Sequence, residues 1–294
     1  MPEDSPAARL LRLMAVPARP VLAPGVWDGL SARLAVRAGA AALHASGGAI
    51  ARAAGQPDLG IIGLAEMEAR IGEIVEGAGG VPVIADADAG YGGPLNVAHA
   101  ARRLARLGVA ALHIEDQPFP KRCGLLDGVG VVAAEEMLAR MRAARAALPP
   151  GGPLLIARTD ALKAEGEAAA LARMRAYLAA GAEIAFVEGL EDAGAIARAA
   201  AALHPAPLLF NASMSATGLP LPPERLGALG VRIIIYPGDA QRAAIAAMAR
   251  CFATVLEAGD SRAMAADLAP ASLRDGVVGT GALMAQEAAW RGGA

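Results

Sequence analysis

Two carboxylates stand close together in a glycine-rich segment, VPVIADADAGYGG, that runs from Val81 to Gly93. Its apolar, β-branched start is typical of a strand buried on both faces. Asp86 and Asp88 follow, and alternation along a continued strand would point both side chains to the same face. Two carboxylates before an open glycine loop suit a hard divalent cation, although aspartate and glycine also mark ordinary strand ends.

A third carboxylate, Glu115, lies in the segment HIEDQ and shares its alternation phase with His113. On a strand next to the first, it would join Asp86 and Asp88 in a site of three carboxylates. So few acids leave room for water and substrate oxygens, which is typical of Mg²⁺, with Mn²⁺ as the alternative. An ion pair of Arg158 with Glu115 or with Asp116 is compatible with the same pattern.

Further polar groups suit a substrate that carries carboxylates. In the segment Ser46–Gly48, two glycines would let backbone N–H groups approach an oxygen of a bound acid. Arg158 offers the planar fork that matches a carboxylate, and Asn211 and Ser213 could hold a second carboxyl group. Each feature also occurs in ordinary loops, so only their location at one common site indicates substrate binding.

A long irregular segment after the fourth apolar segment contains Cys123, just after Lys121 and Arg122. A long loop at the mouth of a barrel is usually a lid, and nearby cations favour the thiolate form of a cysteine. We therefore expect Cys123 to take part in chemistry, with a passive loop cysteine as the alternative. Cys251 lies in an apolar helical segment and is expected in the core.

Eight short apolar segments alternate with alanine-rich helical segments, which predicts βαβ units and a parallel sheet. At 294 residues they fit one α/β fold, a (β/α)8 TIM-type barrel, whose strand ends meet at one mouth. Charged groups gathered there are costly in a purely structural barrel, so we expect an enzyme. We predict strands at Pro20–Val26, Ala41–Ser46, Val81–Ala85, Ala110–Asp116, Leu154–Asp160, Ile184–Leu190, Pro207–Ser213 and Arg232–Gly238, and helices at Leu30–Ala38, Leu64–Val75, Asn96–Leu107, Glu135–Leu148, Glu167–Ala180, Asp192–Leu203 and Ala240–Leu256.

Composition excludes several other classes of protein. Hydrophobic residues make up 55%, but no stretch approaches the ~18 uninterrupted apolar residues of a membrane helix. The first residues carry acids where a signal peptide carries positive charge, so we expect a cytoplasmic protein without a membrane partner. A net charge of −2 gives no electrostatic case for nucleic acid. We expect a catalytic barrel over residues 1–258 and a helical tail over 259–294, which closes the barrel or reaches another subunit.

Taken together, these motifs resemble the isocitrate lyase/phosphoenolpyruvate mutase superfamily over roughly residues 8–258. The similar segments are PGVWDGLSAR, SGG, PDLG, ADADAGYG, HIEDQ, PKRCG, IARTDA, FVEG and YPGDAQRA. PKRCG is similar to the branch of 2-methylisocitrate lyase and related enzymes. The resemblance implies Mg²⁺-dependent cleavage of a carbon–carbon bond in a small 2-hydroxy di- or tricarboxylate, which gives a 2-oxo acid and a second carboxylate.

The resemblance also implies roles for individual residues. Asp86, Asp88 and Glu115 correspond to the Mg²⁺ site, and Cys123 to a lid thiol that protonates the leaving carbanion. It further implies that the C-terminal helix is exchanged between subunits, commonly in a homotetramer. With Cys123, we count Arg158 and His44 as catalytic, and we assign substrate binding to Ser46, Gly47, Gly48, Lys121, Gly124, Glu188, Asn211, Ser213 and Arg242.

Three positions depart from the pattern of that superfamily. Leu125 stands where the lid motif normally ends in histidine, and His44 replaces the usual tyrosine. After the seventh strand, Asn211-Ala-Ser-Met-Ser-Ala216 replaces NMTEFG, which removes an acid and an aromatic residue. We therefore expect the same reaction class on a different acid. Decarboxylation of an oxaloacetate-like acid, phosphonomutase or other C–P bond chemistry, and a non-catalytic metabolite-binding barrel are the alternatives.

Overall fold

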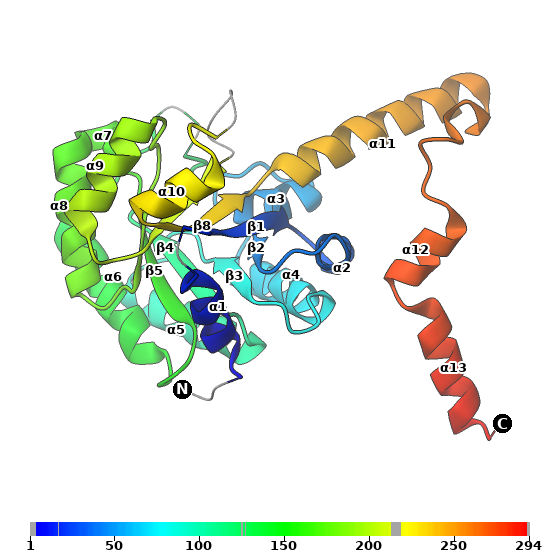
Figure 1. The fold of residues 1–294 in the computed structure, drawn as a ribbon, viewed down its shortest axis with the longest axis horizontal. Helices are drawn as coiled ribbons and strands as arrows, with labels where there is room; N and C mark the ends of the chain where they lie inside the picture. Colours follow the sequence, from blue (N-terminus) through cyan, green and yellow to red (C-terminus); the bar gives the residue numbers. More distant parts are fainter. Residues whose placement is uncertain (1–3, 17, 125, 127, 213–218, 293–294) are drawn as a thin grey trace.

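The computed structural model describes residues 4–16, 18–124, 126, 128–212 and 219–292. Eight parallel strands close into a barrel in chain order, and helices surround it (Figure 1), which confirms the predicted (β/α)8 fold. The strands are β1 (Val21–Val26), β2 (Leu43–Ala45), β3 (Val83–Asp86), β4 (Ala111–Glu115), β5 (Leu154–Thr159), β6 (Ile184–Val187), β7 (Leu208–Asn211) and β8 (Val231–Tyr236).

Both faces of the strands are buried, which explains why their sequences are almost continuously apolar. Side chains such as Ile84, Ile156 and Leu209 fill the barrel, whereas their neighbours pack beneath the helices. The helices that precede the last strand are α1 (Pro6–Met14), α2 (Gly29–Arg37), α3 (Gly47–Ala53), α4 (Leu64–Gly77), α5 (Pro94–Leu107), α6 (Ala134–Ala147), α7 (Ala161–Glu165), α8 (Glu167–Ala179), α9 (Ala193–Leu203) and α10 (Pro223–Leu229).

Helix α1 was not predicted, and it belongs to the core of the barrel. Its Ala7, Leu10 and Met14 are buried in one cluster with the inward-facing strand residues. Ser5 caps the helix, because its side chain accepts a hydrogen bond from the Ala8 N–H at 3.2 Å. The helix therefore closes one end of the barrel and leaves the carboxyl ends of the strands as the mouth.

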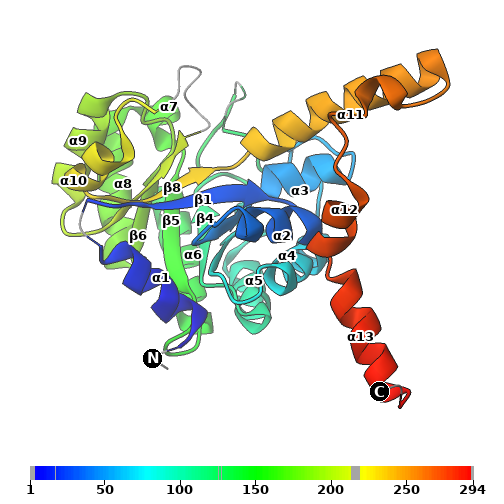
Figure 2. The ribbon, with the colours of Figure 1, turned by 45° about the vertical axis from the view of Figure 1, so that its right-hand side comes forward.

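The chain after β8 leaves the barrel as an arm (Figures 1 and 2). The arm consists of α11 (Asp239–Ala258), the 3-10 turn Arg262–Met264, α12 (Ala271–Val277) and α13 (Thr280–Trp290). Gln241 is the single buried residue of α11, and α12 and α13 bury none. The prediction that Cys251 lies in the core is therefore wrong, because this part of α11 extends away from the barrel and leaves the side chain partly exposed.

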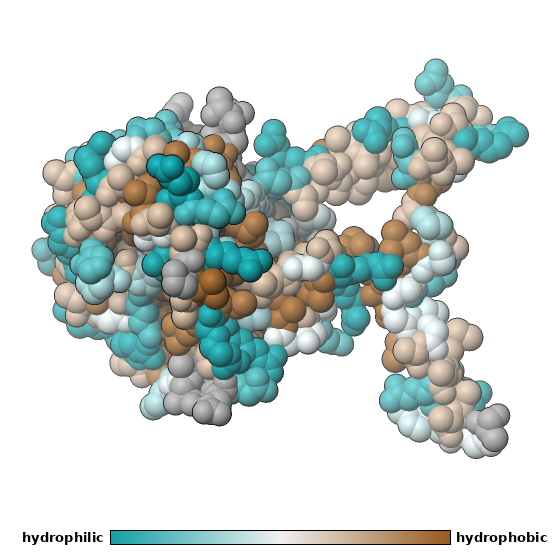
Figure 3. Space-filling view, in the orientation of Figure 1, coloured by the Kyte–Doolittle hydropathy of each residue, from teal (hydrophilic) through white to brown (hydrophobic). Residues whose placement is uncertain are grey.

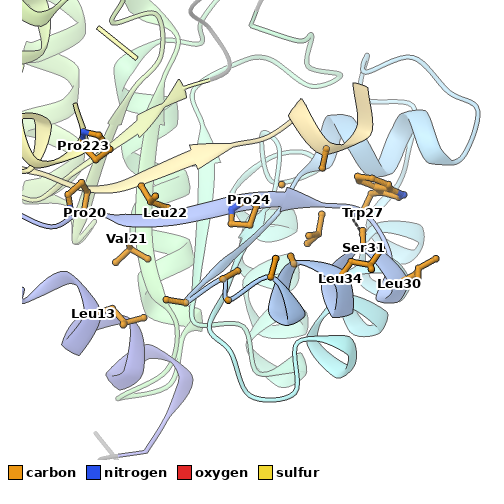
Figure 4. Close-up of a pocket in the computed structure, with 18 of the residues that line it drawn as sticks. Leu13, Pro20, Val21, Leu22, Pro24, Trp27, Leu30, Ser31, Leu34 and Pro223 are labelled. Carbon is orange, nitrogen blue, oxygen red and sulfur yellow. Dashed lines mark hydrogen bonds between the residues drawn. The ribbon is translucent and has the colours of Figure 1, made fainter. Parts of the chain in front are cut away.

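An apolar groove of about 1170 Å³ lies beside β1, between α1, α2 and the start of the arm (Figure 4). Leu22, Leu30 and Leu34 line it and are 43–49% exposed. In a (β/α)8 barrel an outer helix would be expected to cover this face, but α11 leads away from it. Hydrophobic surface consequently faces the arm (Figure 3). No helix of the described residues is long and apolar enough to cross a membrane.

Candidate active site

A cavity of about 350 Å³ opens at the carboxyl ends of the strands. Gly47, Asp88 and Glu115 lie behind its wall and contact residues that line it. Ser213 and Leu125 lie outside the described residues. The predicted site residues that line the cavity come from five strand ends, the start of α3, the lid and α11, and they are His44, Ser46, Gly48, Asp86, Lys121, Cys123, Gly124, Arg158, Glu188, Asn211 and Arg242.

Asp86 ends β3 and is fixed from two sides. The Gly47 N–H donates to its Oδ2 at 3.1 Å, and the Asp88 N–H donates to its Oδ1 at 3.0 Å. A Cβ added at Gly47 would lie 2.8 Å from Asp86 Oδ2, so this contact requires glycine. The prediction that strand alternation orients Asp88 is wrong, because β3 ends at Asp86 and Asp88 adopts a left-handed conformation with φ of 47°.

Lys121 brings a buried positive charge into the site from the lid, which we define as residues 117–124. Its Nζ lies 2.6 Å from Asp58 Oδ1 and 2.8 Å from Asp88 Oδ1. Burial alone would lower the pKa of Lys121, but Asp88, Glu115 and further carboxylates outweigh it and raise this pKa well above its usual value. The Cys123 N–H also donates to the Asp58 carbonyl at 3.0 Å, so the lid is closed over the cavity.

Arg158, near the end of β5, is surrounded by carboxylates. Its Nε and Nη2 donate to Asp160 at 3.0 and 2.9 Å, and its Nη1 lies 3.2 Å from Glu115 Oε2. Glu188 Oε2 is 3.6 Å from Nη2, and the guanidinium lies 5.2 Å from the centre of the Phe186 ring. The fork of Arg158 is thus already occupied, and the ion pair with Glu115 that the sequence left open is present.

The inner site contains more carboxylates than cations. Burial raises the pKa of Asp88 to about 6 and that of Glu115 well above its usual value. Glu115 Oε1 accepts no hydrogen bond from any described residue, and Glu115 Oε2 and Asp88 Oδ1 meet only the cations Arg158 and Lys121, at 3.2 and 2.8 Å. Buried oxygens with unmet hydrogen-bonding capacity fit a divalent cation, which prefers carboxylate ligands. Lys121 and Arg158 stand against six carboxylates, which are Asp58, Asp86, Asp88, Glu115, Asp160 and Glu188.

Two histidines lie beside these carboxylates. His44 Nε2 is 3.0 Å from His113 Nε2, and His113 Nδ1 is 3.6 Å from Asp86 Oδ1. Burial lowers the pKa of His44 to about 3 and that of His113 to about 4, so both rings are neutral. A proton on His113 Nδ1 would face Asp86, which leaves His113 Nε2 to accept from His44 Nε2–H and makes His44 Nδ1 a bare acceptor.

His44, Asp86 and His113 also form a group whose donor atoms lie within 4.8 Å of one another and could hold a metal ion. The site therefore offers two overlapping donor sets. The three carboxylates match a hard cation such as Mg²⁺, whereas imidazole nitrogens suit Zn²⁺, Cu²⁺ or Fe²⁺. The contact between the two Nε2 atoms occupies ring nitrogens that a metal would need, so the carboxylate set is the better match to this geometry.

Several residues of the site were not predicted. Asp58, the partner of Lys121, lies in the quoted PDLG segment, but nothing in that segment indicates which cation it meets. His113 was not predicted as a site residue, although its phase with Glu115 in HIEDQ was a usable signal. Gln117 was missed as well: its side-chain amide donates to the Arg122 carbonyl at 3.0 Å and accepts from the Arg122 N–H at 2.9 Å.

A closed (β/α)8 barrel with a small, acid-lined cavity at its mouth and a cysteine on its lid defines a barrel enzyme. Residues 11–256 match the family profile described as phosphoenolpyruvate phosphomutase. The chain therefore belongs to the phosphoenolpyruvate mutase/isocitrate lyase superfamily, as its motifs predicted.

The relatives include carbon–carbon lyases. The chain is 36% identical to 2-methylisocitrate lyase of Bacillus subtilis (strain 168), with 88% of this chain and 85% of the relative covered. It is 39% identical to 2,3-dimethylmalate lyase of Eubacterium barkeri, with 79% of each covered. Among solved structures, oxaloacetate acetylhydrolase with 3,3-difluorooxalacetate has a TM-score of 0.89 at 37% identity, over 99% of this chain and 98% of that one. Phosphonopyruvate hydrolase with oxalate and Mg²⁺ has a TM-score of 0.86 at 26% identity, over 97% and 98%.

The neutral state of His44 predicts how stability depends on pH. The unfolded chain binds a proton at this histidine near pH 6.5, whereas the folded protein does not until about pH 3. Since the unfolded state binds more protons in this window, stability falls as pH drops. His44→Gln should make the free energy of unfolding fall by about 2 kcal/mol less between pH 7 and pH 5 than it does in the wild type, as measured by urea unfolding. An unchanged pH dependence in the variant would contradict a neutral, buried His44.

Proposed function

We propose that this protein is a Mg²⁺-dependent carbon–carbon lyase that cleaves a small 2-hydroxy di- or tricarboxylate into a 2-oxo acid and a second carboxylate. The observation that carries the proposal is the excess of buried carboxylates beside a lid cysteine in one cavity. The two lyases among the relatives support this reaction class. The different residues at His44 and around Asn211 favour a substrate other than 2-methylisocitrate.

Asp86, Asp88 and Glu115 would hold the metal ion, and Mn²⁺ could replace Mg²⁺ at the same oxygens. When bound, the ion supplies positive charge that polarises oxygens of the acid. The relative crystallised with oxalate and Mg²⁺ supports the choice of this cation. The lining backbone at Gly48 and the Ser46 side chain would bind the 2-oxo acid, with Gly47 giving the close approach to Asp86.

The reaction requires one proton to leave the substrate and another to be delivered. Glu188, whose pKa burial raises, would accept the proton of the 2-hydroxyl group as the carbonyl forms. His44 Nδ1 would orient that hydroxyl group as a hydrogen-bond acceptor. The electron pair of the broken C–C bond passes to the carbon next to the carboxylate of the leaving fragment, and the Cys123 thiol protonates that carbon. The charge of Arg158 stabilises the developing enediolate.

The alternatives are less well supported by this cavity. Decarboxylation of an oxaloacetate-like acid does not need a thiol placed to protonate a separate leaving fragment, yet Cys123 lines the cavity. C–P bond chemistry does not need this thiol either. A non-catalytic barrel does not need Glu115 and Asp88 buried with their pKa values raised.

Asp86→Ala should reduce Mg²⁺-dependent turnover by about 10³-fold or more, because the substrate oxygens lose their shared charge. The assay follows release or consumption of 2-oxo acid from a panel of malate, citrate and oxaloacetate analogues. Glu76→Ala, which removes an exposed carboxylate from α4, is the matched control. Near-normal turnover without Asp86, or in excess chelator, would remove the metal from the proposal.

Cys123→Ser should slow turnover by about 10²–10⁴-fold where proton delivery limits the rate, because a hydroxyl group is a much weaker acid than a thiol. The KM should change little, since other residues bind the substrate. Cys251→Ser is the matched control, because that cysteine lies on the arm. An unchanged rate in Cys123→Ser would make the thiol a bystander and favour decarboxylation or C–P chemistry.

We also propose a homo-oligomer, with a homotetramer as the expected size, in which the arm of one copy covers the apolar groove of another. Phe252, Leu256, Leu283 and Trp290 on the arm are 63–85% exposed, so each copy carries both an apolar arm and an uncovered groove. Residues 1–258 would then form the catalytic domain, from which α11 leads into the arm, and 259–294 an exchanged tail. The cytoplasmic location and the lack of nucleic-acid and membrane partners stay predictions.

Deletion of residues 259–294 should lower the oligomeric state and expose apolar surface, because α12 and α13 are lost from the contact. Sedimentation velocity of the full and truncated chains measures the change. A truncated protein that sediments as the same oligomer and unfolds at the same urea concentration would contradict a role of the tail in assembly.

A further inference from the structure

Asp116 is a buried carboxylate that the proposed mechanism does not use. It follows Glu115 at the end of β4, but it lies between β5 and α8 and does not line the cavity. Its Oδ2 accepts hydrogen bonds from Thr159 Oγ1 at 2.7 Å and from the Tyr177 hydroxyl at 3.0 Å, and its Oδ1 accepts from the Asp160 N–H at 2.9 Å. Burial raises the pKa of Asp116, and these three hydrogen bonds lower it. The donors thus compensate for a costly buried charge and fix the carboxylate in one orientation.

The Asp160 N–H links Asp116 to the arginine of the cavity. Asp160 follows β5 and has a φ of −98° and a ψ of 9°, in the sparsely populated bridge region where many active-site residues lie. Its carboxylate binds Nε and Nη2 of Arg158. Asp116 holds the Asp160 N–H and the side chain of Thr159, which stands between the two partners of this ion pair. The orientation of the Arg158 fork therefore depends on a carboxylate outside the cavity.

Further contacts on the outer side of the barrel hold Asp116 in place. Arg173 on α8 donates from Nη1 to the Tyr177 hydroxyl oxygen at 3.1 Å and to the Val132 carbonyl at 2.8 Å. Its Nε donates at 2.7 Å to Glu165, the last residue of α7. The Val132 N–H donates to the Asp116 carbonyl at 2.8 Å. Asp116 is thus anchored both to the elements beside Asp160 and to the segment that leads from the lid to α6.

We propose that Asp116 is a positioning residue of the active site, which sets the orientation of Arg158 through Asp160; this inference rests on the proposed lyase function. Arg158 has to direct its charge at an oxygen that becomes negative during the reaction, so its orientation matters more than its presence. Residues that orient the groups in contact with a ligand typically contribute about 10–100-fold to affinity or activity at metal sites. A change at Asp116 should therefore weaken binding of an enediolate-like anion without removing any group that contacts it.

Oxalate is an unreactive probe of this role, because it has the planar, doubly charged form of the enediolate of a 2-oxo acid. Asp116→Asn keeps the size of the side chain and removes its charge. Titration calorimetry with Mg²⁺ should show that this variant binds oxalate about tenfold more weakly than the wild type. Tyr177→Phe is the matched control, because it removes one donor to the same carboxylate and leaves the bond to the Asp160 N–H in place. Its affinity for oxalate should stay within about twofold of the wild-type value.

A double-mutant cycle separates positioning from a general loss of stability. Asp160→Asn removes the ion pair with Arg158 but keeps the backbone N–H that Asp116 binds. If Asp116 acts through Asp160, then Asp116→Asn should weaken oxalate binding by less than about twofold further in the Asp160→Asn background. The same tenfold loss in both backgrounds, or an equal loss in Tyr177→Phe, would show a general structural role and overturn the proposal.

Thr159→Val is the second variant, and urea unfolding shows which of the variants are folded. It removes the donor to Asp116 that lies next to Asp160, so it should weaken oxalate binding by about threefold. If Asp116→Asn does not fold, an unchanged affinity in folded Thr159→Val would overturn the positioning role. Unchanged affinity in folded Asp116→Asn would do the same, and in both cases the lyase proposal stands. If the wild-type protein does not bind oxalate with Mg²⁺, both proposals fail.

Discussion

The mouth of the barrel holds more buried negative charge than Lys121 and the largely buried Arg158 neutralise, and the rest of the site is arranged around that imbalance. Lys121 comes from the lid and Arg158 from β5, while the carboxylates that surround them come from β3, β4, β6 and the loops beside them. Removing one cation would leave carboxylates buried without a partner, which costs several kcal/mol. The same imbalance attracts a divalent cation.

Local sequence was sufficient for the strands and for the carboxylates at their ends, because buried parallel strands have a simple apolar pattern and one common polar end. It was not sufficient to predict which side chains of the site contact one another. The turn that orients Asp88, the contact between Asp58 and Lys121 and the occupied fork of Arg158 all join segments far apart in the chain. The pattern gave candidates for the site, and tertiary structure decided which of them pair.

The incorrect placement of Cys251 has a related cause. An apolar helical segment predicts burial, but it does not say which surface buries it. Helix α11 is apolar and long, yet it leaves the barrel after its first turns, and Phe252 beyond Cys251 is 63% exposed. The groove beside β1 is exposed for the same reason, since the chain that would cover it has left. In a single copy, the apolar face of α11 and the groove beside β1 both stay exposed to solvent. Burial of Cys251 within a single chain was therefore the wrong expectation.

The lid and the carboxylates constrain each other through the backbone as well as through charge. Gln117 holds the backbone of Arg122 with both ends of its amide, and the buried Arg140 donates to the Gln117 carbonyl at 2.9 Å. Lys121 lies between these anchors and directs its ammonium toward Asp58 and Asp88. Opening the lid would withdraw this charge from two largely buried carboxylates. The closed position that brings Cys123 to the cavity is therefore favoured by the same excess of buried negative charge that suits a metal ion.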